Sequence, residues 1–132
     1  MSGLIYLDAS AIVKLVVEED ESPALRDALR GRPQRVSSAL ALVEVHLAAA
    51  RRVPAPTSAR VANVLAGLAL MPIDLPTLEH AADLGSHGLR ALDAIHLASA
   101  LSLTEDLESL IAYDQRLLAA AQASGLQTEE PR

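Results

Sequence analysis

The fold class is indicated by Leu4-Ile5-Tyr6-Leu7-Asp8-Ala9-Ser10, a short apolar run that ends abruptly in polar residues. The run holds a β-branched and an aromatic residue and is typical of a strand buried on both faces. Directly after it, an apolar stripe over residues 12, 13, 15 and 16 predicts a helix. A buried strand followed at once by a helix indicates an α/β protein.

The rest of the chain continues this alternation of strands and helices. Further strands are predicted over residues 35–37, 69–73 and 108–112, with a small edge strand over 126–128. Helices are predicted over 22–31, 39–52, 57–68, 76–84, 91–103 and 117–123, and residues 85–88 form a loop. Pro72 favours an edge position for the third strand, where a missing backbone donor is tolerated. The pattern therefore predicts a mainly parallel sheet of about four to five strands covered by helices.

Composition limits the class of protein further. The chain has 132 residues, a net charge of −6 and no cysteine, which excludes disulfide scaffolds, thiolate zinc sites and cysteine nucleophiles. Its length fits a single domain over residues 1–132. The longest interior apolar stretch, residues 61–73, is shorter than the about 18 residues of a membrane span, and Asp8 interrupts any signal-peptide core. We therefore expect a cytoplasmic protein with no membrane partner.

The charge balance and the aromatic content argue against ordinary nucleic-acid binding. An acidic chain repels a polyanion unless a metal site reverses the field locally. Two tyrosines, with no Phe or Trp, provide no platform for stacking bases. The sequence also lacks the glycine-rich nucleotide-binding motifs and the nucleophile elbow of hydrolases.

Four of the 17 acidic residues stand apart, because each is embedded in apolar sequence. Asp8 and Asp114 follow predicted strands, at the edge where α/β sheets bind ligands, and Glu44 and Asp93 lie within apolar helices. A buried carboxylate needs a cation, strong hydrogen-bond donors, protonation or a metal ion. The chain has a single lysine and no zinc-like spacing of histidine and cysteine, so oxygen ligands for a hard divalent cation fit best.

Each of these residues also has an ordinary structural explanation. Asp8 and Asp114 are suited to capping the helices that follow them. Glu44 and Asp93 can equally lie on the exposed edge of amphipathic helices. Ser10 either caps the first helix or hydrogen-bonds a carboxylate or a metal-bound water.

Two histidines and two arginines lie close to these acids in the sequence. His46 and His96 are expected to be packed, hydrogen-bonded residues in the wall of the site, outside the ligand set. Arg90 and Arg116 are candidate phosphate contacts, and a solvated surface position is the alternative for both.

Four motifs follow one another along the chain: Leu7-Asp8-Ala9-Ser10-Ala11, Glu44, Leu92-Asp93-Ala94-Ile95-His96-Leu97-Ala98 and Tyr113-Asp114-Gln115-Arg116-Leu117. Together they resemble a PIN domain, in particular the VapC toxins of bacterial toxin–antitoxin pairs, over nearly the whole chain. The resemblance implies a three-layer α/β/α sandwich and a magnesium- or manganese-dependent endoribonuclease. It also implies that Asp8, Glu44, Asp93 and Asp114 are the catalytic metal ligands and that Ser10 supports them. The chain departs from its relatives at Ala112, where a threonine or serine commonly supports the last acid.

A hydrophobic content of 51% is generous for a small monomer and predicts an uncovered apolar surface on the early helices. The residues expected there are Leu25, Leu29, Val43, Leu47, Val61, Val64 and Leu65. The resemblance implies RNA as the substrate, a homodimer, and a VapB-type antitoxin that covers this surface in a toxin–antitoxin hetero-oligomer. An antitoxin arginine would suit the acidic pocket, because a guanidinium pairs well with carboxylates.

Three other interpretations remain open at this point. A receiver-like binding module shares an acidic pocket at strand ends, but it expects a lysine after a late strand, and the only lysine here is Lys14. An all-helical interaction protein fits the alanine- and leucine-rich segments but not the strand-like runs. A housekeeping PIN nuclease without an antitoxin fits the same motifs.

Overall fold

The computed structural model describes residues 3–85 and 88–132; the predicted loop residues Ser86 and His87 lie outside the described residues. Its centre is a sheet of five strands: β1 (Leu4–Leu7), β2 (Arg35–Ser38), β3 (Ala69–Met71), β4 (Leu107–Ile111) and β5 (Thr128–Glu129). The strand order is β3-β2-β1-β4-β5, and all four neighbouring pairs are parallel. The sequence-based prediction of a parallel sheet is therefore confirmed, and β1 is its central strand.

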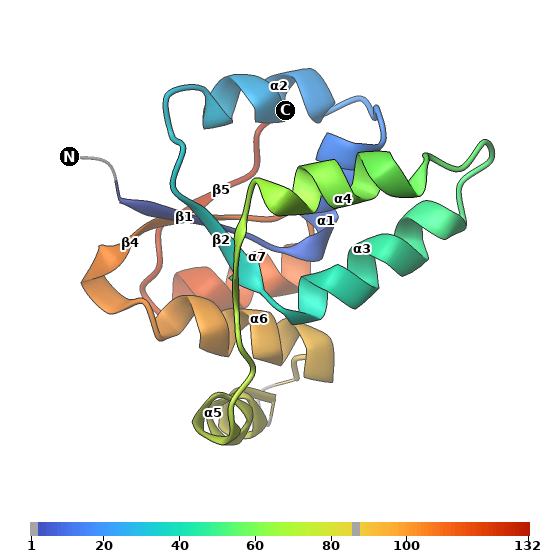
Figure 1. Ribbon diagram of the computed structural model, residues 1–132. Coiled ribbons are helices and arrows are strands. Elements are labelled where there is room, and N and C mark those ends of the chain that lie inside the picture. The colour runs from blue at the N-terminus through green and yellow to red at the C-terminus, as the bar shows by residue number, and fades with distance from the viewer. Residues whose placement is uncertain (1–2, 86–87) are drawn as a thin grey trace.

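Helices cover both faces of this sheet (Figure 1). On one side lie α1 (Ala9–Val16), α2 (Ser22–Leu29), α3 (Leu40–Ala50) and α4 (Ser58–Ala66). On the other lie α6 (Ala91–Leu101) and α7 (Gln115–Ala123), with α5 (Leu75–Gly85) packed on α6 rather than on the sheet. A 3₁₀ turn (Thr104–Asp106) leads into β4. This three-layer α/β/α arrangement confirms the predicted fold class and rules out the all-helical interpretation.

The element boundaries follow from local sequence signals. Thr57 caps α4 by accepting the Arg60 N–H at 3.1 Å, and β3 ends at Met71, directly before Pro72. β3 is an edge strand, as the proline predicted. Ser38 ends β2, and its hydroxyl accepts the N–H of Leu40, the first residue of α3, at 3.1 Å.

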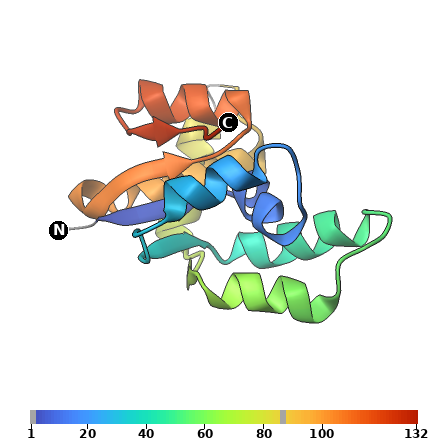
Figure 2. The same cartoon turned by 90° about the horizontal axis from the view of Figure 1, so that it is seen from above.

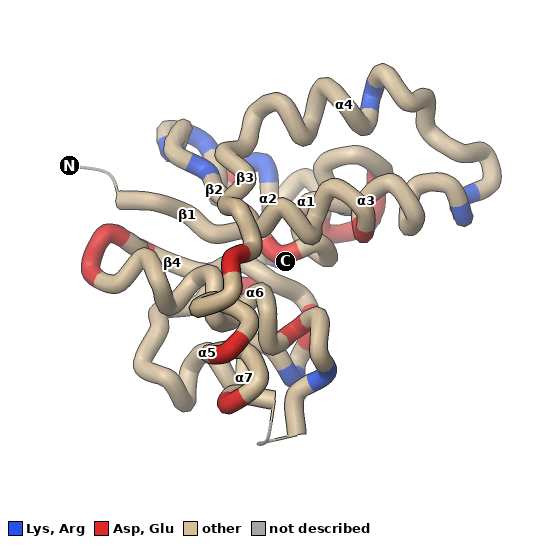
Figure 3. The backbone as a smooth tube through the Cα atoms, turned by 60° about the horizontal axis from the view of Figure 1, so that its bottom comes forward, with Lys and Arg blue, Asp and Glu red and all other residues tan. Residues whose placement is uncertain are grey.

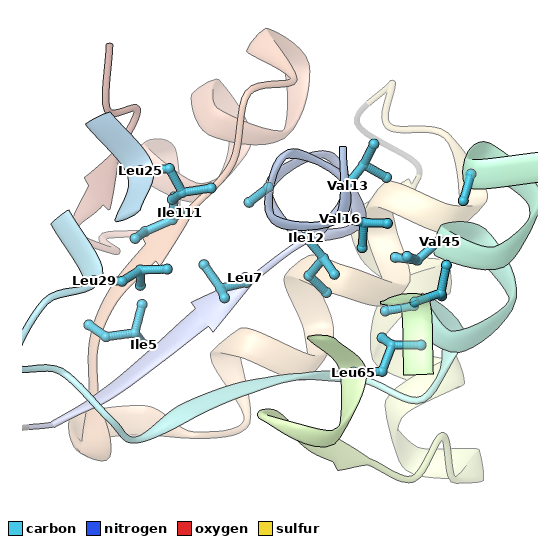
Figure 4. Packing of buried hydrophobic residues seen from close by; sticks show 14 residues of the cluster. Ile5, Leu7, Ile12, Val13, Val16, Leu25, Leu29, Val45, Leu65 and Ile111 are labelled. Carbon is cyan, nitrogen blue, oxygen red and sulfur yellow. The ribbon is translucent and has the colours of Figure 1, made fainter. Parts of the chain in front are cut away.

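Two apolar clusters hold the layers together. The larger joins β1 and β4 to the four helices on one side of the sheet (Figure 4). In it, Leu25 and Leu29 of α2 lie over the sheet, while Ile12 of α1 lies close to α3 and α4. The smaller cluster fixes α6 and α7 to the opposite face through residues such as Leu97 and Leu117. The strand of residues 4–7 is buried from both faces, as its uninterrupted apolar pattern predicted.

The predicted apolar surface is only partly present. Leu25, Leu29, Val61 and Leu65 are buried in the core, so their assignment to an uncovered surface was wrong. α2 packs across β1 and β4, and α4 packs against α1 and α3, which covers these four side chains.

An exposed apolar surface does exist on α3, where Val43 and Leu47 are each 54% exposed and Leu42 lies beside them at 46%. Figure 2 shows α3 and α4 side by side, extending together past the sheet. None of the described helices is long and apolar enough to cross a membrane.

Candidate functional site

Asp8 lies at the carboxyl end of the central strand and caps the helix that follows. Its Oδ1 accepts the Ala11 N–H at 3.0 Å and the Ser10 hydroxyl at 2.6 Å. Only 4% of the residue is exposed. Burial is the main cause that raises the pKa of Asp8 from 3.8 to about 6, and the nearby Glu44 charge adds to it. The capping role is therefore real, and the buried Asp8 carboxylate forms no ion pair with a described lysine or arginine.

Ser10 connects two strand ends. Its hydroxyl donates to Asp8 and accepts the Tyr113 N–H at 3.0 Å, so the turn after β1 is tied to the turn after β4. Ser10 is the second residue of α1, and Asp8 is the cap, so the interpretation of Ser10 as the helix cap was wrong. Its position matches the other interpretation, a hydroxyl that holds a carboxylate.

Asp114 follows β4 and caps α7 in the same manner. Its Oδ1 accepts the N–H groups of Arg116 and Leu117 at 2.9 and 3.1 Å. Ala112, two residues earlier, is fully buried in the cluster under α7. Helix amides therefore orient Asp114 where the family resemblance had suggested a hydroxyl at position 112.

Glu44 reaches the site from α3 and is held by a buried pair from two other elements. His96 Nε2 lies 2.6 Å from Glu44 Oε1, and His96 Nδ1 lies 2.7 Å from the Tyr6 hydroxyl. An ionised carboxylate only accepts, so Nε2–H donates to Glu44, and in that tautomer the Tyr6 hydroxyl donates to Nδ1. The prediction of His96 as a packed, hydrogen-bonded residue is confirmed, whereas His46 is exposed and its prediction was wrong.

Asp93 lies in the first turn of α6 and is half-buried. Burial raises its pKa, the charges of Asp114 and Glu44 raise it further, and Arg90 acts in the opposite direction. Together with the Asp8–Glu44 interaction, these effects place all four acids within one electrostatic neighbourhood. They come from four elements at the carboxyl edge of the sheet, where neighbouring parallel strands end.

The donor set suits a hard divalent cation. Within the described residues, the hydrogen bonds to Asp8, Glu44 and Asp114 use one oxygen of each carboxylate and leave the other available. In residues 3–85 and 88–132 no three such side chains stand close enough together to form a ready ligand group. Mg²⁺ commonly binds through one or two carboxylates and keeps several waters, so a looser set of acids is compatible with it.

One cavity is lined by an acid of the site, and a second lies beside α7. The first, of about 330 Å³, is lined by Ser10, Asp114 and Tyr113, together with Val13, Lys14, Glu19 and Arg52. The other, of about 670 Å³, lies between α6 and α7 and is lined mostly by leucine and alanine, with Arg116 as its charged residue. Asp114 therefore lines a cavity together with residues of α1 and of the turn after β4.

Sequence reasoning missed Tyr6 and the partnership of His96 with Glu44. Tyr6 was recognised only as part of a buried strand, and its hydroxyl is the signal that was overlooked. A buried tyrosine hydroxyl needs a hydrogen-bond partner, which makes a polar neighbour inside the core necessary.

Comparison with known proteins gives one consistent result. The family model described as "PIN domain" matches residues 5–123. The chain is 49% identical to Ribonuclease VapC46 of Mycobacterium tuberculosis over 129 residues, which covers 96% of this chain and 97% of the relative.

Solved structures agree in fold. The crystal structure of M. tuberculosis VapC20, described as a sarcin–ricin loop cleaving toxin, matches with a TM-score of 0.75 at 16% identity, over 96% of this chain and 99% of that one. A toxin–antitoxin complex from Klebsiella pneumoniae matches with a TM-score of 0.73 at 22% identity, over 97% and 98% of the two chains.

Proposed function

This chain belongs to the PIN-domain family, and from that premise we propose that it is a VapC-type ribonuclease toxin that cuts RNA phosphodiesters with the help of Mg²⁺ or Mn²⁺. The observation that carries the proposal is the neighbourhood of Asp8, Glu44, Asp93 and Asp114 at one edge of the sheet. Acids grouped in this way repel one another, and a divalent cation relieves that repulsion. The relative of 49% identity, itself named a ribonuclease, supports the same assignment.

The four acids are the residues that would hold the metal, and three of them are oriented by hydrogen bonds from the described residues. Ser10 and the α1 amide fix Asp8, His96 fixes Glu44, and the α7 amides fix Asp114. When bound, the cation lowers the pKa of a water and neutralises charge on the phosphodiester. These fixed hydrogen bonds keep one oxygen of each carboxylate in place, so the free oxygens need little rearrangement to meet a cation.

Purified protein provides the direct test. Titration calorimetry with Mn²⁺ and cleavage of a labelled RNA are compared for the wild type, Asp8→Asn and Asp93→Asn. We expect both variants to lose metal affinity and cleavage, because each removes a ligand charge. Asp27→Asn, which changes an exposed acid paired with Arg30 on α2, is the matched control and should behave like the wild type. Equal metal binding by the wild type and both site variants would refute the metal site.

We further propose that the chain works as one PIN domain in the cytoplasm, forms a homodimer and is inhibited by a VapB-type antitoxin. The exposed Leu42, Val43 and Leu47 on α3 give such partners an apolar surface. Induced expression should stop growth, and co-expression of the neighbouring small open reading frame should restore it. If the chain harms cells through RNA cleavage but no neighbouring gene relieves it, a housekeeping nuclease replaces the toxin.

A further inference from the structure

Most of the lysine and arginine side chains form ion pairs or hydrogen bonds within the protein, and a few do not. All eleven lysines and arginines lie in the described part of the chain. Six of them form ion pairs with carboxylates: Lys14, Arg26, Arg30, Arg32, Arg52 and Arg132. Two more, Arg35 and Arg60, donate to backbone carbonyls. These eight side chains are held by the protein itself.

Three arginines remain with no hydrogen bond or ion pair to a described residue: Arg51, Arg90 and Arg116. Two of these three begin the helices that carry acids of the site. Arg90 is the residue before α6 and precedes Asp93 by three positions, and Arg116 lies in the first turn of α7, two positions after Asp114. Figure 3 shows basic positions beside acidic ones where these helices begin. The third, Arg51, ends α3.

An arginine beside a cluster of acids normally forms an ion pair with one of them, because the guanidinium matches a carboxylate well. Arg90 lies close enough to act on the pKa of Asp93, yet it makes no ion pair with it. The Arg116 backbone N–H donates to Asp114, but its side chain forms no such pair and lines the apolar cavity between α6 and α7. Both residues are exposed, and no hydrogen bond from either guanidinium group to a described residue competes with a ligand.

The ligand that fits these donors is a phosphodiester chain. RNA carries a negative charge at every residue, and a protein of net charge −6 with acids at its site repels those charges. A bound cation balances the phosphate that is cut, but the neighbouring phosphates still need positive groups. The two uncommitted arginines supply them at the starts of α6 and α7, where the helix dipoles also favour an anion.

We propose that Arg90 and Arg116 bind the RNA phosphates next to the one that is cut and thereby set the path of the strand across the acids. This inference rests on the proposed ribonuclease function. The arginines are binding residues with no part in the chemical step. Their loss therefore raises KM and leaves kcat largely unchanged.

The test uses Arg90→Gln, Arg116→Gln and the double variant, with Arg51→Gln as the matched control. The control removes the same charge from an arginine that also has no partner among the described residues and that ends α3, about two helical turns beyond Glu44. Binding of a fluorescent single-stranded RNA is measured by anisotropy, and cleavage by the rise in KM, at salt concentrations from about 50 to 200 mM.

We expect the loss of either arginine, in Arg90→Gln or Arg116→Gln, to weaken RNA binding about tenfold, which is the size of one charge-assisted contact. Each loss should also make the plot of log affinity against log salt shallower by about 0.7. Arg116→Lys should recover part of the loss, and Arg51→Gln should stay within about twofold of the wild type. Site variants that behave like Arg51→Gln in affinity and salt slope would overturn the inference, as would a loss confined to kcat.

The two proposals fail in different ways. A wild-type protein that cuts no RNA with either cation contradicts the ribonuclease, whatever the arginines do. In that case the anisotropy measurement still decides whether the arginines bind RNA. Normal cleavage together with unchanged RNA affinity in the double variant contradicts only the role of the arginines.

Discussion

Replacing Asp8 by asparagine should make the metal-free protein more stable at neutral pH. Asp8 is almost fully buried, and its carboxylate lies near the Glu44 charge. An asparagine Oδ1 can still accept the Ala11 N–H and the Ser10 hydroxyl, so both hydrogen bonds survive while the buried charge disappears. The same change should abolish metal-dependent cleavage, so stability and activity move in opposite directions.

The magnitude follows from the raised pKa. Folding lifts the pKa of Asp8 from 3.8 to about 6, so between these values the folded state binds more protons than the unfolded state. The free energy of unfolding therefore falls as pH rises through this window. Above it the loss is complete and amounts to about 3 kcal/mol. The Asp8→Asn variant lacks this loss. Its free energy of unfolding should therefore exceed that of the wild type by about 3 kcal/mol at pH 8, and the difference should vanish near pH 3.5.

Urea titrations in EDTA at a series of pH values measure this difference, because titrating groups that do not interact with Asp8 cancel between the two proteins. Asp74→Asn is the matched control. Asp74 also accepts a helix N–H, from Thr77 at 2.9 Å, but it is exposed and its hydrogen bonds to Thr77 lower its pKa. Its charge therefore stabilises the fold above its unfolded pKa, and its removal should lower stability at pH 8.

An Asp8→Asn variant that is no more stable than the wild type at pH 8, with a normal urea dependence, would refute the reasoning. So would an advantage that stays constant between pH 4 and pH 8. Either result would mean that the Asp8 charge is already well compensated inside the metal-free protein.

Three further measurements examine other parts of the structure. Tyr6→Phe leaves His96 Nδ1 buried without a partner and should lower the free energy of unfolding by about 1–3 kcal/mol in a urea titration; a change below about 0.3 kcal/mol would contradict this. Mn²⁺ at 100 times its Kd should stabilise the wild type by about 2.7 kcal/mol in a thermal melt, reversed by EDTA, and a shift that persists without the site acids would place the ion elsewhere. Val43→Ser with Leu47→Ser should shift a dimer toward monomer in light scattering, whereas Val53→Ser, at an isolated residue that is 98% exposed, should not.

The sequence was most informative where one residue's environment depends on its near neighbours. The run at residues 4–7 predicted a buried strand, Pro72 predicted an edge, and the positions after the strands predicted that Asp8 and Asp114 share one edge of the sheet. These inferences use an uninterrupted apolar run, the missing backbone donor of a proline or a rule about strand ends. Such rules operate within a single element or its end.

Contacts between distant elements were the part that sequence reasoning could not supply. The sequence pattern predicted an exposed position for Leu25, but α2 packs on β1 and β4 and buries this side chain. Glu44 finds its partner His96 only because α3 and α6 approach the same edge from opposite faces of the sheet. The bond of the Ser10 hydroxyl to the Tyr113 N–H could not be predicted, because Tyr113 lies 103 residues away in the sequence.

Because β1 is the central strand of the sheet, its pairing and the site beside it are completed late in synthesis. Ile5 pairs with Arg35 on one side and with Ser109 on the other, so one edge of β1 stays open until the fourth strand has left the ribosome. Asp114 follows that strand directly and brings the last of the four acids. A chain interrupted before residue 107 has a central strand that is paired along one edge only, and it lacks Asp114. Nearly the whole message must therefore be translated before the four acids can come together in one chain.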